Sequence, residues 1–224
     1  MDSSSFEKTP LNTVKRLPKR GHYNKETVYS ILDNNFLCHL SWEKDGQPHI
    51  IPTAYGRKDD ILYIHGSSKS RMLEALKDGR ALCMVVTQID GLVLARSVFH
   101  HSMNYQSVVI YGSAHEVEGE EKMDGLRVVS DQIIAGRWDE ARLPNELEMK
   151  ATTVLAITID SASAKIRTGP PGDDEADYDL PVWAGVLPTR IIFDDPVSDP
   201  AMKMQVPVSN SVKSKTSPTI SNSE

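Results

Sequence analysis

The sequence is poor in cysteine and has no long apolar segment, and each shortage excludes a class of protein. Only two of the 224 residues are cysteine, Cys38 and Cys83, and each lies inside an apolar, strand-like run. We therefore expect two buried free thiols rather than a disulfide scaffold. No apolar run approaches the ~20 residues of a membrane helix, and the polar start Met1-Asp2-Ser3 is unlike a signal peptide. These features predict a soluble, cytoplasmic protein with no membrane partner.

Clustered positive charge and metal-binding motifs are also missing. The chain has 25 Lys and Arg against 31 Asp and Glu, which gives a formal net charge of −6 at pH 7. Nucleic-acid binding needs a basic face, so we expect no nucleic-acid partner. No Cys-x-x-Cys, His-x-His or Glu-x-x-His pattern accompanies the histidines, and no Walker or Rossmann glycine pattern is present. We expect no metal site and no dinucleotide-binding fold of the Rossmann type.

The composition is that of one globular unit with polar ends. Apolar residues make up 39% of the chain and charged residues 25%, which suffices for a single core. Residues 1–20 are polar and interrupted by prolines, and residues 194–224 are rich in Ser, Thr and Lys. We predict a flexible N-terminal arm over 1–20, a folded domain over 21–193 and a low-complexity tail over 194–224.

Within that domain, short strand patterns follow one another with turn residues between them, and few helices intervene. Asp45-Gly46 predicts a hairpin turn, and Ile89-Asp90-Gly91 predicts a second turn between two strands. Helical spacing predicts helices after Asn24, from Ser67 or Ser68 to about Gly79, over 120–134, and after Pro144. This pattern favours a mainly β fold, an antiparallel barrel of six or seven strands. The predicted strands are 36–43, 49–56, 61–66, 81–88, 91–98, 105–117, 152–160 and 163–169.

The segment FHHSMNYQSVVIYGSAHEV, residues 99–117, holds two adjacent histidines, His100 and His101. In an extended strand neighbouring side chains point to opposite faces, so the pair cannot easily bind one metal ion. We expect one of them to be packed and the other to face solvent. His39 lies in an apolar run and is expected to be a hydrogen-bonded core histidine.

His65 ends an apolar strand in LYIHGSSKSRML, where small hydroxyl residues, Lys69 and Arg71 lead into a helix. A helix N-terminus with hydroxyls and cations is the environment that a phosphate monoester prefers. The same residues would also serve as an ordinary serine-capped helix with surface cations. Composition alone leaves both interpretations open.

Three blocks together resemble a known family: HLSWEKDGQPHIIPTAYGRKDDILYIHGSSKSRML, DGLVLARSVFHHSMNYQSVVIYGSAHEV and LPVWAGVLP. They are similar to the flavin-nucleotide-binding branch of the pyridoxamine 5′-phosphate oxidase-like superfamily, a neighbour of the nitroimidazole reductases. The resemblance covers about residues 20–190. It implies an FMN-binding split β-barrel and a homodimer with one FMN in each of two clefts between the subunits.

The resemblance also implies roles for individual residues. The strand-to-helix junction would hold the FMN phosphate, the 102–107 segment would line the flavin, often from the other subunit, and Trp183 would close the cleft. His65 and His101 are the candidates for proton delivery to a small-molecule substrate. The predicted cofactor-binding residues are His65, Gly66, Ser67, Lys69, Ser70, Arg71, Ser102, Met103, Asn104, Tyr105, Gln106, Ser107 and Trp183.

Two features keep alternatives open. Relatives commonly carry Arg where this chain has Gln106, and a lost charge-assisted hydrogen bond would cost roughly 1.5–3 kcal/mol if this side chain faces the phosphate. The acidic loop 172–181 is either a solvated loop or a substrate lid. We expect an FMN-dependent oxidoreductase with a nitroreductase-like or a flavin-reductase-like activity. The rivals are a split barrel that binds flavin without turnover and one that binds haem through a cleft histidine.

Overall fold

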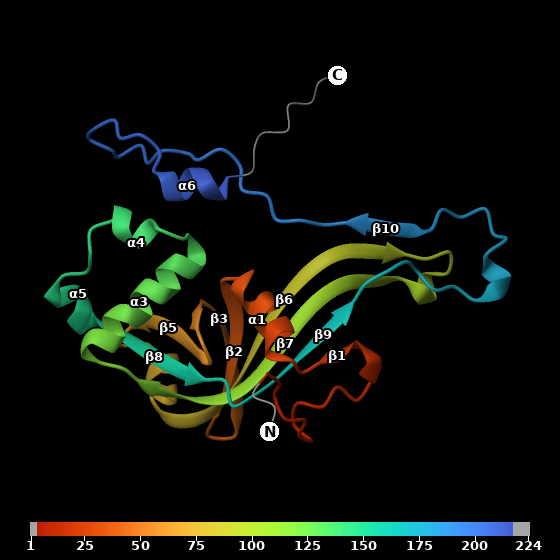
Figure 1. The fold of residues 1–224 in the computed structure, drawn as a ribbon, viewed down its shortest axis with the longest axis horizontal. Coiled ribbons are helices and arrows are strands. Elements are labelled where there is room, and N and C mark those ends of the chain that lie inside the picture. The colour runs from red at the N-terminus through yellow and green to blue at the C-terminus, as the bar shows by residue number, and fades with distance from the viewer. Residues whose placement is uncertain (1–3, 217–224) are drawn as a thin grey trace.

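The computed structural model describes residues 4–216, and its centre is one strongly curved antiparallel sheet (Figure 1). The order of hydrogen-bonded strands is β3-β2-β6-β7-β8-β5-β4, with β9 also paired to β7, β1 to β9, and β10 to β6. The sheet curls around the core without closing, because β3 and β4 form its two ends. This open, barrel-like body is called the barrel below. The mainly β antiparallel fold is therefore confirmed. The strands are β1 Gly21–His22, β2 Leu37–Lys44, β3 Gln47–Ala54, β4 Gly56–Lys58, β5 Ile61–Ser67, β6 Asp78–Leu94, β7 Ser102–Glu116, β8 Thr152–Thr158, β9 Ser161–Arg167 and β10 Gly185–Pro188.

Helices cover only part of this sheet. α3 packs against β4, β5 and β8, and Asn24 caps α1 by accepting a hydrogen bond from Thr27 N at 2.8 Å. The helices are α1 Lys25–Asp33, α2 Arg71–Leu76, α3 Gly119–Ile133, α4 Arg137–Glu140, α5 Glu146–Ala151 and α6 Asn210–Lys215, with short 3₁₀ turns η1 Pro18–Arg20, η2 Val98–His100 and η3 Glu175–Asp177.

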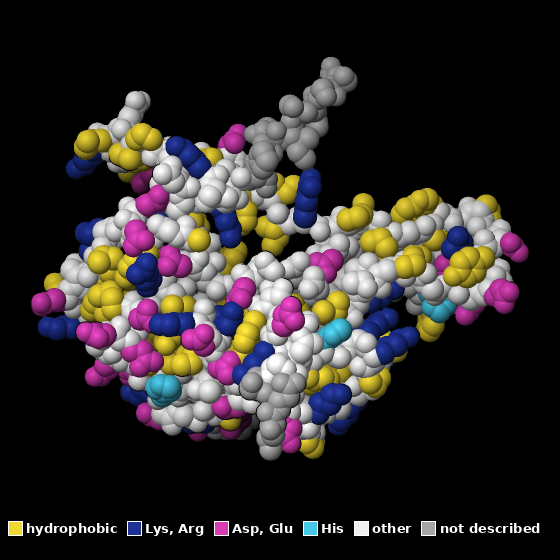
Figure 2. Space-filling view, viewed as in Figure 1, with side chains coloured by type: hydrophobic (Ala, Val, Ile, Leu, Met, Phe, Trp, Pro, Cys, Tyr) yellow, Lys and Arg dark blue, Asp and Glu magenta, His cyan; other side chains and the backbone are white. Residues whose placement is uncertain are grey.

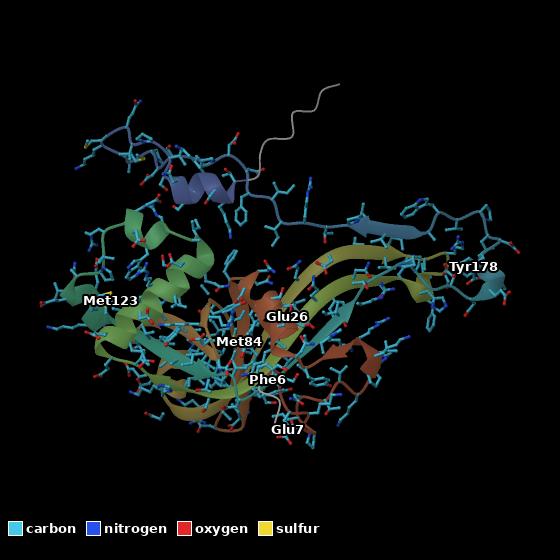
Figure 3. The ribbon with its side chains drawn as sticks, in the orientation of Figure 1. Phe6, Glu7, Glu26, Met84, Met123 and Tyr178 are labelled. Atoms are coloured by element: carbon cyan, nitrogen blue, oxygen red, sulfur yellow. The ribbon has the colours of Figure 1, made fainter. Side chains whose placement is uncertain are left out.

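The core follows from the alternation of side chains along the strands. Cys38, Leu40 and Trp42 of β2 are buried, while the residues between them point away from the core. Met84 of β6 lies at the centre of the barrel (Figure 3). A second, smaller apolar cluster lies between the sheet and α3, around Tyr63.

Two extensions leave the barrel. The far ends of β6 and β7 form a curved arm, residues 87–107, which extends away from the rest of the sheet (Figure 1). The chain returns along this arm as β10 and continues as a strap, residues 185–216, which crosses back to α6. At α6 the Ser211 side chain is buried, and its Oγ donates a hydrogen bond to Glu140 of α4.

Three local predictions are wrong. β6 runs through Ile89-Asp90-Gly91 as one 17-residue strand, because a β-bulge absorbs the extra residue where a turn was expected. α2 begins at Arg71, three or four residues later than predicted, since β5 continues to Ser67 and Ser70 is the cap. His39 is exposed on the outer face of β2 rather than held in the core.

The predicted hairpin, three of the predicted helices and the free thiols are confirmed. The hairpin of β2 and β3 turns at Asp45 and Gly46, both with positive φ, and helices occur after Asn24, over 119–133 and after Pro144. Cys38 and Cys83 are free thiols, one buried and one half-buried. Among the described residues no helix is both long and apolar enough to cross a bilayer.

The predicted domain limits at residues 20 and 193 remain predictions, but the segments outside both limits contact the folded unit, the C-terminal one through Ser211 and Glu140 of α4. Phe6 is only 8% exposed and joins the main core, and the Asn12 amide donates to Ala162 O at 3.3 Å. Residues 217–224 of the predicted tail lie outside the described residues.

Candidate functional site

The junction between β5 and α2 gathers donors on an exposed surface. Ser70 Oγ accepts a hydrogen bond from Leu73 N at 3.5 Å, and Lys69 N donates to Ser67 Oγ at 3.2 Å. Lys69 and Arg71 are exposed, and neither forms an ion pair with any described residue. α2 has only six residues, so hydroxyls and side-chain cations, rather than a helix dipole, would attract an anion here. These donors fit a phosphate group.

His65 and Gly66 shape the strand side of this junction. The His65 side chain is exposed in a single copy, and its surroundings still lower its pKa by desolvation. Its imidazole is therefore mainly neutral near pH 7, and no described residue hydrogen-bonds to it. A Cβ on Gly66 would lie 3.2 Å from Leu73 Cδ1, so this backbone packs closely on α2.

The predicted flavin wall, Ser102–Ser107, lies on β7 within the arm. Met103 is 45% exposed and Tyr105 is half-buried, so both can cover an apolar ring. Asn104 is 8% exposed and already engaged, since its Nδ2 donates to Gly169 O at 3.1 Å and its Oδ1 accepts from Arg167 Nη1.

Within one copy the structure does not bring the wall and the junction together. Ala114 is the first β7 residue paired with β8, and β8 in turn pairs with β5 beside His65. At about 3.3 Å per residue, Asn104 and Ala114 are roughly 33 Å apart along β7. The two predicted halves of the pocket therefore lie at opposite ends of this strand.

Gln106 has a structural role that the sequence did not reveal. Its Nε2 donates to Asp90 Oδ2 at 3.1 Å, and Gln88 Nε2 donates to the other oxygen at 2.8 Å. The carbonyl oxygen of Asp90 also accepts a hydrogen bond from Thr189 N at 3.1 Å, and this bond fixes the start of the strap on the bulge of β6. In one copy Gln106 thus organises the arm and does not approach the junction.

The two adjacent histidines occupy a 3₁₀ turn at the tip of the arm, not an extended strand. His100 Nε2 lies 3.5 Å from Asp174 Oδ2, and His101 Nε2 lies 3.2 Å from Ala95 O. The neighbouring Val98 and Phe99 are more than 80% exposed, which is unusual for large apolar side chains.

The acidic loop 172–181 is partly tied to this tip. Asp173 has no exposed side-chain area; its carboxylate accepts from Arg96 N and Ser97 N and pairs with Arg96 Nη1 at 3.2 Å. Burial alone would raise the pKa of Asp173, and these donors outweigh it, so the pKa is lowered. Tyr178 lies at the far end of the arm (Figure 3). Its ring covers the Arg96 guanidinium, with 4.7 Å from Cζ to the ring centre. Trp183, beyond the loop, is 68% exposed.

Sequence reasoning missed Arg96, Asp173 and Arg167, which fix the tip and base of the arm. Arg167 ends an alternating strand just before Thr168-Gly169-Pro170, and Arg96 lies two residues beyond Leu94, the last residue of β6. A cation at the end of an apolar strand was the available signal. The partners of these arginines lie up to 77 residues away in the chain, so the pairing itself could not be predicted from the sequence.

Over β3, β2, β6 and β7 the outer face of the sheet is exposed and rich in apolar side chains, whereas α3 covers this face over β4, β5 and β8. Ladder pairs place the side chains of β3, β2, β6 and β7 on this face in rows. Ile50 and Leu37 are 63% and 51% exposed. The apolar and aromatic residues of this face are Leu37, Ile50, Pro52, Cys83, Val85, Val109 and Tyr111, and the polar His39, Ser41, Thr87 and Ser107 lie among them.

No group of three or more His, Cys, Asp or Glu side chains with a metal-binding arrangement occurs among residues 4–216. This finding concerns clusters only, and a single histidine can still serve as an axial ligand to haem iron.

Solved structures similar along nearly the whole chain are redox-cofactor proteins. A flavocytochrome from Azotobacter vinelandii is 38% identical with a TM-score of 0.85, and covers 92% of this chain and 97% of its own. A FAD and heme binding protein from Mycobacterium smegmatis is 33% identical with a TM-score of 0.84, covering 88% of this chain and 97% of its own. No curated protein sequence matches the chain.

A third structure shares the fold only. A candidate 5-nitroimidazole antibiotic resistance protein from Bacteroides thetaiotaomicron is 20% identical with a TM-score of 0.53, and covers 64% of this chain and 84% of its own. The family model described as pyridoxamine 5′-phosphate oxidase matches residues 24–166, which is more than half of the chain. The chain therefore belongs to the pyridoxamine 5′-phosphate oxidase-like family of flavin-binding proteins.

Proposed function

We propose that this protein is a homodimeric redox protein that binds a flavin nucleotide and a haem and transfers electrons between them and a small molecule. The observation that carries this proposal is the similarity of the whole chain to a flavocytochrome and to a FAD and heme binding protein. Both matches extend beyond residue 166, where the family model ends, and so include much of the C-terminal third.

The separation of the two half-sites supports the dimer. The wall around Met103 lies at one end of β7 and the junction around Arg71 lies beside the other end, and the segment of β7 between Asn104 and Ala114 spans roughly 33 Å. One flavin ring and its phosphate cannot bridge that length of strand. A second copy packed on the outer apolar face would bring its own arm to the junction of the first. Two equivalent clefts would result, as a two-fold axis requires.

Each half-site has a distinct task in this proposal. Lys69, Arg71 and the serine hydroxyls would hold a phosphate, while Met103 and Trp183 would cover the ring and exclude water. The flavin supplies hydride and single-electron chemistry when bound. The chain's own contribution is binding, orientation and a proton carrier close to the ring.

His65 is the histidine best suited to contact a cofactor. A haem-iron ligand, like a proton carrier, needs a neutral imidazole with an accessible nitrogen. Desolvation lowers the pKa of His65, and its ring has no hydrogen-bond partner among the described residues, whereas His101 and His100 have neighbours at Ala95 and Asp174. His65 is therefore proposed as the haem ligand, with proton delivery to the flavin as the competing role.

The flavin is proposed to be FAD, because the Mycobacterium smegmatis relative binds FAD. FMN, which the sequence resemblance implies, is the direct competitor. The first experiment is a titration of the purified protein with FAD, FMN and haem, followed by visible absorption. We expect a flavin spectrum with at least tenfold preference for FAD, and a Soret band with haem.

A His65→Ala variant then separates the two roles. Loss of the Soret band with unchanged flavin binding would identify His65 as the iron ligand. An unchanged Soret band with slower bleaching of the flavin by a nicotinamide donor would identify it as a proton carrier. Absence of binding of either cofactor to the wild-type protein at micromolar concentrations would refute the proposed function.

A further inference from the structure

Arg167, the last residue of β9, is a buried cation without an anionic partner. Arg167 is only 8% exposed. Its Nη1 donates hydrogen bonds to Asn104 Oδ1 and, at 3.4 Å, to Gly169 O, and its Nη2 donates to Pro170 O at 3.3 Å. All three acceptors are neutral oxygens. No carboxylate in residues 4–216 lies within ion-pair distance of its guanidinium.

Two half-buried arginines, Arg57 and Arg96, are balanced differently. Arg96 pairs with Asp173 at 3.2 Å, and Arg57 pairs with Asp33 at 2.6 Å. Neutral acceptors satisfy the hydrogen-bonding capacity of a guanidinium but do not neutralise its charge, and burying an unpaired charge is costly. Arg167 therefore lacks the compensation that its counterparts have.

Its surroundings add positive rather than negative charge. Desolvation, and after it the nearby Arg20, lower the pKa of Arg167, which is the expected response of a cation among cations. Lys165 lies two residues before it and pairs with Gly21, next to Arg20. Figure 2 shows Lys and Arg side chains gathered over β1 and the end of β9, on a molecule whose net charge is −6.

The location of Arg167 ties it to the proposed cofactor cleft. It lies opposite Tyr105 in the β7–β9 ladder, and it holds the side chain of Asn104, so both neighbours belong to the flavin wall. Two of the five guanidinium N–H groups have no partner among the described residues. Arg167 thus offers both charge and donors at the arm side of the cleft.

We propose that Arg167, with Arg20 beside it and Asn104 as its support, forms an oxyanion subsite for a phosphate of the flavin nucleotide or a propionate of haem. This subsite is separate from the donors at the β5–α2 junction, and it rests on the proposed function. Guanidinium and oxyanion form charge-assisted hydrogen bonds, and removal of one such contact weakens binding by about 10- to 100-fold.

The test uses the full chain with Arg167→Gln, which removes the charge, and Arg167→Lys, which keeps it. Arg142→Gln is the matched control, because the Arg142 side chain is 68% exposed and its only ion-pair partner among the described residues is Glu148, at the surface. Dissociation constants are measured for FAD, FMN, riboflavin, haem and haem dimethyl ester. Riboflavin lacks the phosphate and the ester lacks the carboxylates, so the two analogues identify the anion.

A phosphate ligand predicts that Arg167→Gln weakens FAD, which has a second phosphate, at least tenfold. It leaves riboflavin unchanged, and also FMN, whose single phosphate the β5–α2 donors would hold. A propionate ligand predicts the same loss for haem but not for its dimethyl ester. In either case Arg167→Lys retains most of the affinity, and Arg142→Gln matches the wild type. Arg167→Gln with wild-type affinity for every one of these ligands would overturn the proposal.

A second experiment, which needs neither flavin nor haem, separates this proposal from the proposed function. Inorganic pyrophosphate at millimolar concentration is expected to raise the Tm of the wild type and of Arg167→Lys, but not of Arg167→Gln. If the wild type binds no flavin and no haem, the proposed function fails, and the pyrophosphate result alone decides the subsite. If pyrophosphate shifts neither the wild type nor Arg167→Lys in that case, the subsite fails too.

Discussion

At the scale of single residues, the tightest contact between the sheet and α3 involves a glycine that no side chain can replace. A Cβ at Gly56 would lie 2.4 Å from Val128 O, which is backbone and cannot move aside. We predict that Gly56→Ala lowers the free energy of unfolding by about 1–3 kcal/mol, as overpacking does. Gly172→Ala is the control, because a Cβ there meets nothing within 4 Å. Urea midpoints of the two variants should differ clearly, and equal midpoints would contradict this account of the contact.

His65 gives a pH-dependent prediction. Desolvation lowers its pKa in the folded protein, so below about pH 6.5 the unfolded chain binds a proton that the folded chain resists. Stability should therefore fall on acidification through this window and be fully present above it. His65→Gln should flatten the change in Tm between pH 7.5 and pH 5.5 compared with the wild type. An equally steep change in the variant would assign the pH dependence to other groups.

At the scale of elements, the strap is held at its far end by one short helix. The carboxylate of Glu140 accepts from Ser211 N at 3.2 Å and from the Ser211 hydroxyl, and these bonds lower its pKa, the hydroxyl contributing most. We predict that Glu140→Ala releases α6, so that limited proteolysis cuts the strap several-fold faster while the Tm of the barrel stays the same. Arg142→Gln, also at the surface, should leave the cleavage rate unchanged.

Elements whose signal is local could be predicted from the sequence. The Asp45-Gly46 hairpin and α3 were both predicted because turn chemistry and helical spacing depend on adjacent residues. β6 was wrongly divided at Asp90, since the same Asp-Gly pair here lies in a bulge, where a Cβ at Gly91 would approach Val186 Cγ1 at 2.9 Å. That choice between turn and bulge depends on β10, almost a hundred residues later.

The candidate site likewise has features that the sequence predicts and contacts that it does not. Donors that follow one another in sequence, around His65 and Arg71, were identifiable because hydroxyls and cations at a strand end indicate anion binding. The engagement of Asn104 by Arg167, and of Gln106 by Asp90, depends on strand pairing across the sheet and could not be read from the sequence.

At the scale of the whole molecule, the proposed dimer would account both for the distance between the two half-sites and for the exposed apolar face. Val85 lies near the centre of that face, where its ladder partners are His39 of β2 and Val109 of β7. In a monomer its side chain is half-exposed, so a charge there would remain hydrated and the barrel would keep its fold. In the proposed dimer the same charge would be buried without a partner, which is strongly unfavourable.

We therefore predict that Val85→Asp converts a dimer into a monomer and lowers FAD affinity at least tenfold, because each cleft needs both copies. Leu147→Asp is the matched control: Leu147 is 77% exposed on α5, away from this face, and should leave mass and affinity unchanged. Light scattering gives the mass, and the flavin titration gives the affinity. A monomeric wild type that binds FAD as tightly as the proposal requires would contradict the shared cleft. A dimeric Val85→Asp variant would instead move the interface to another surface, with the exposed tip at Phe99 as the next site to change.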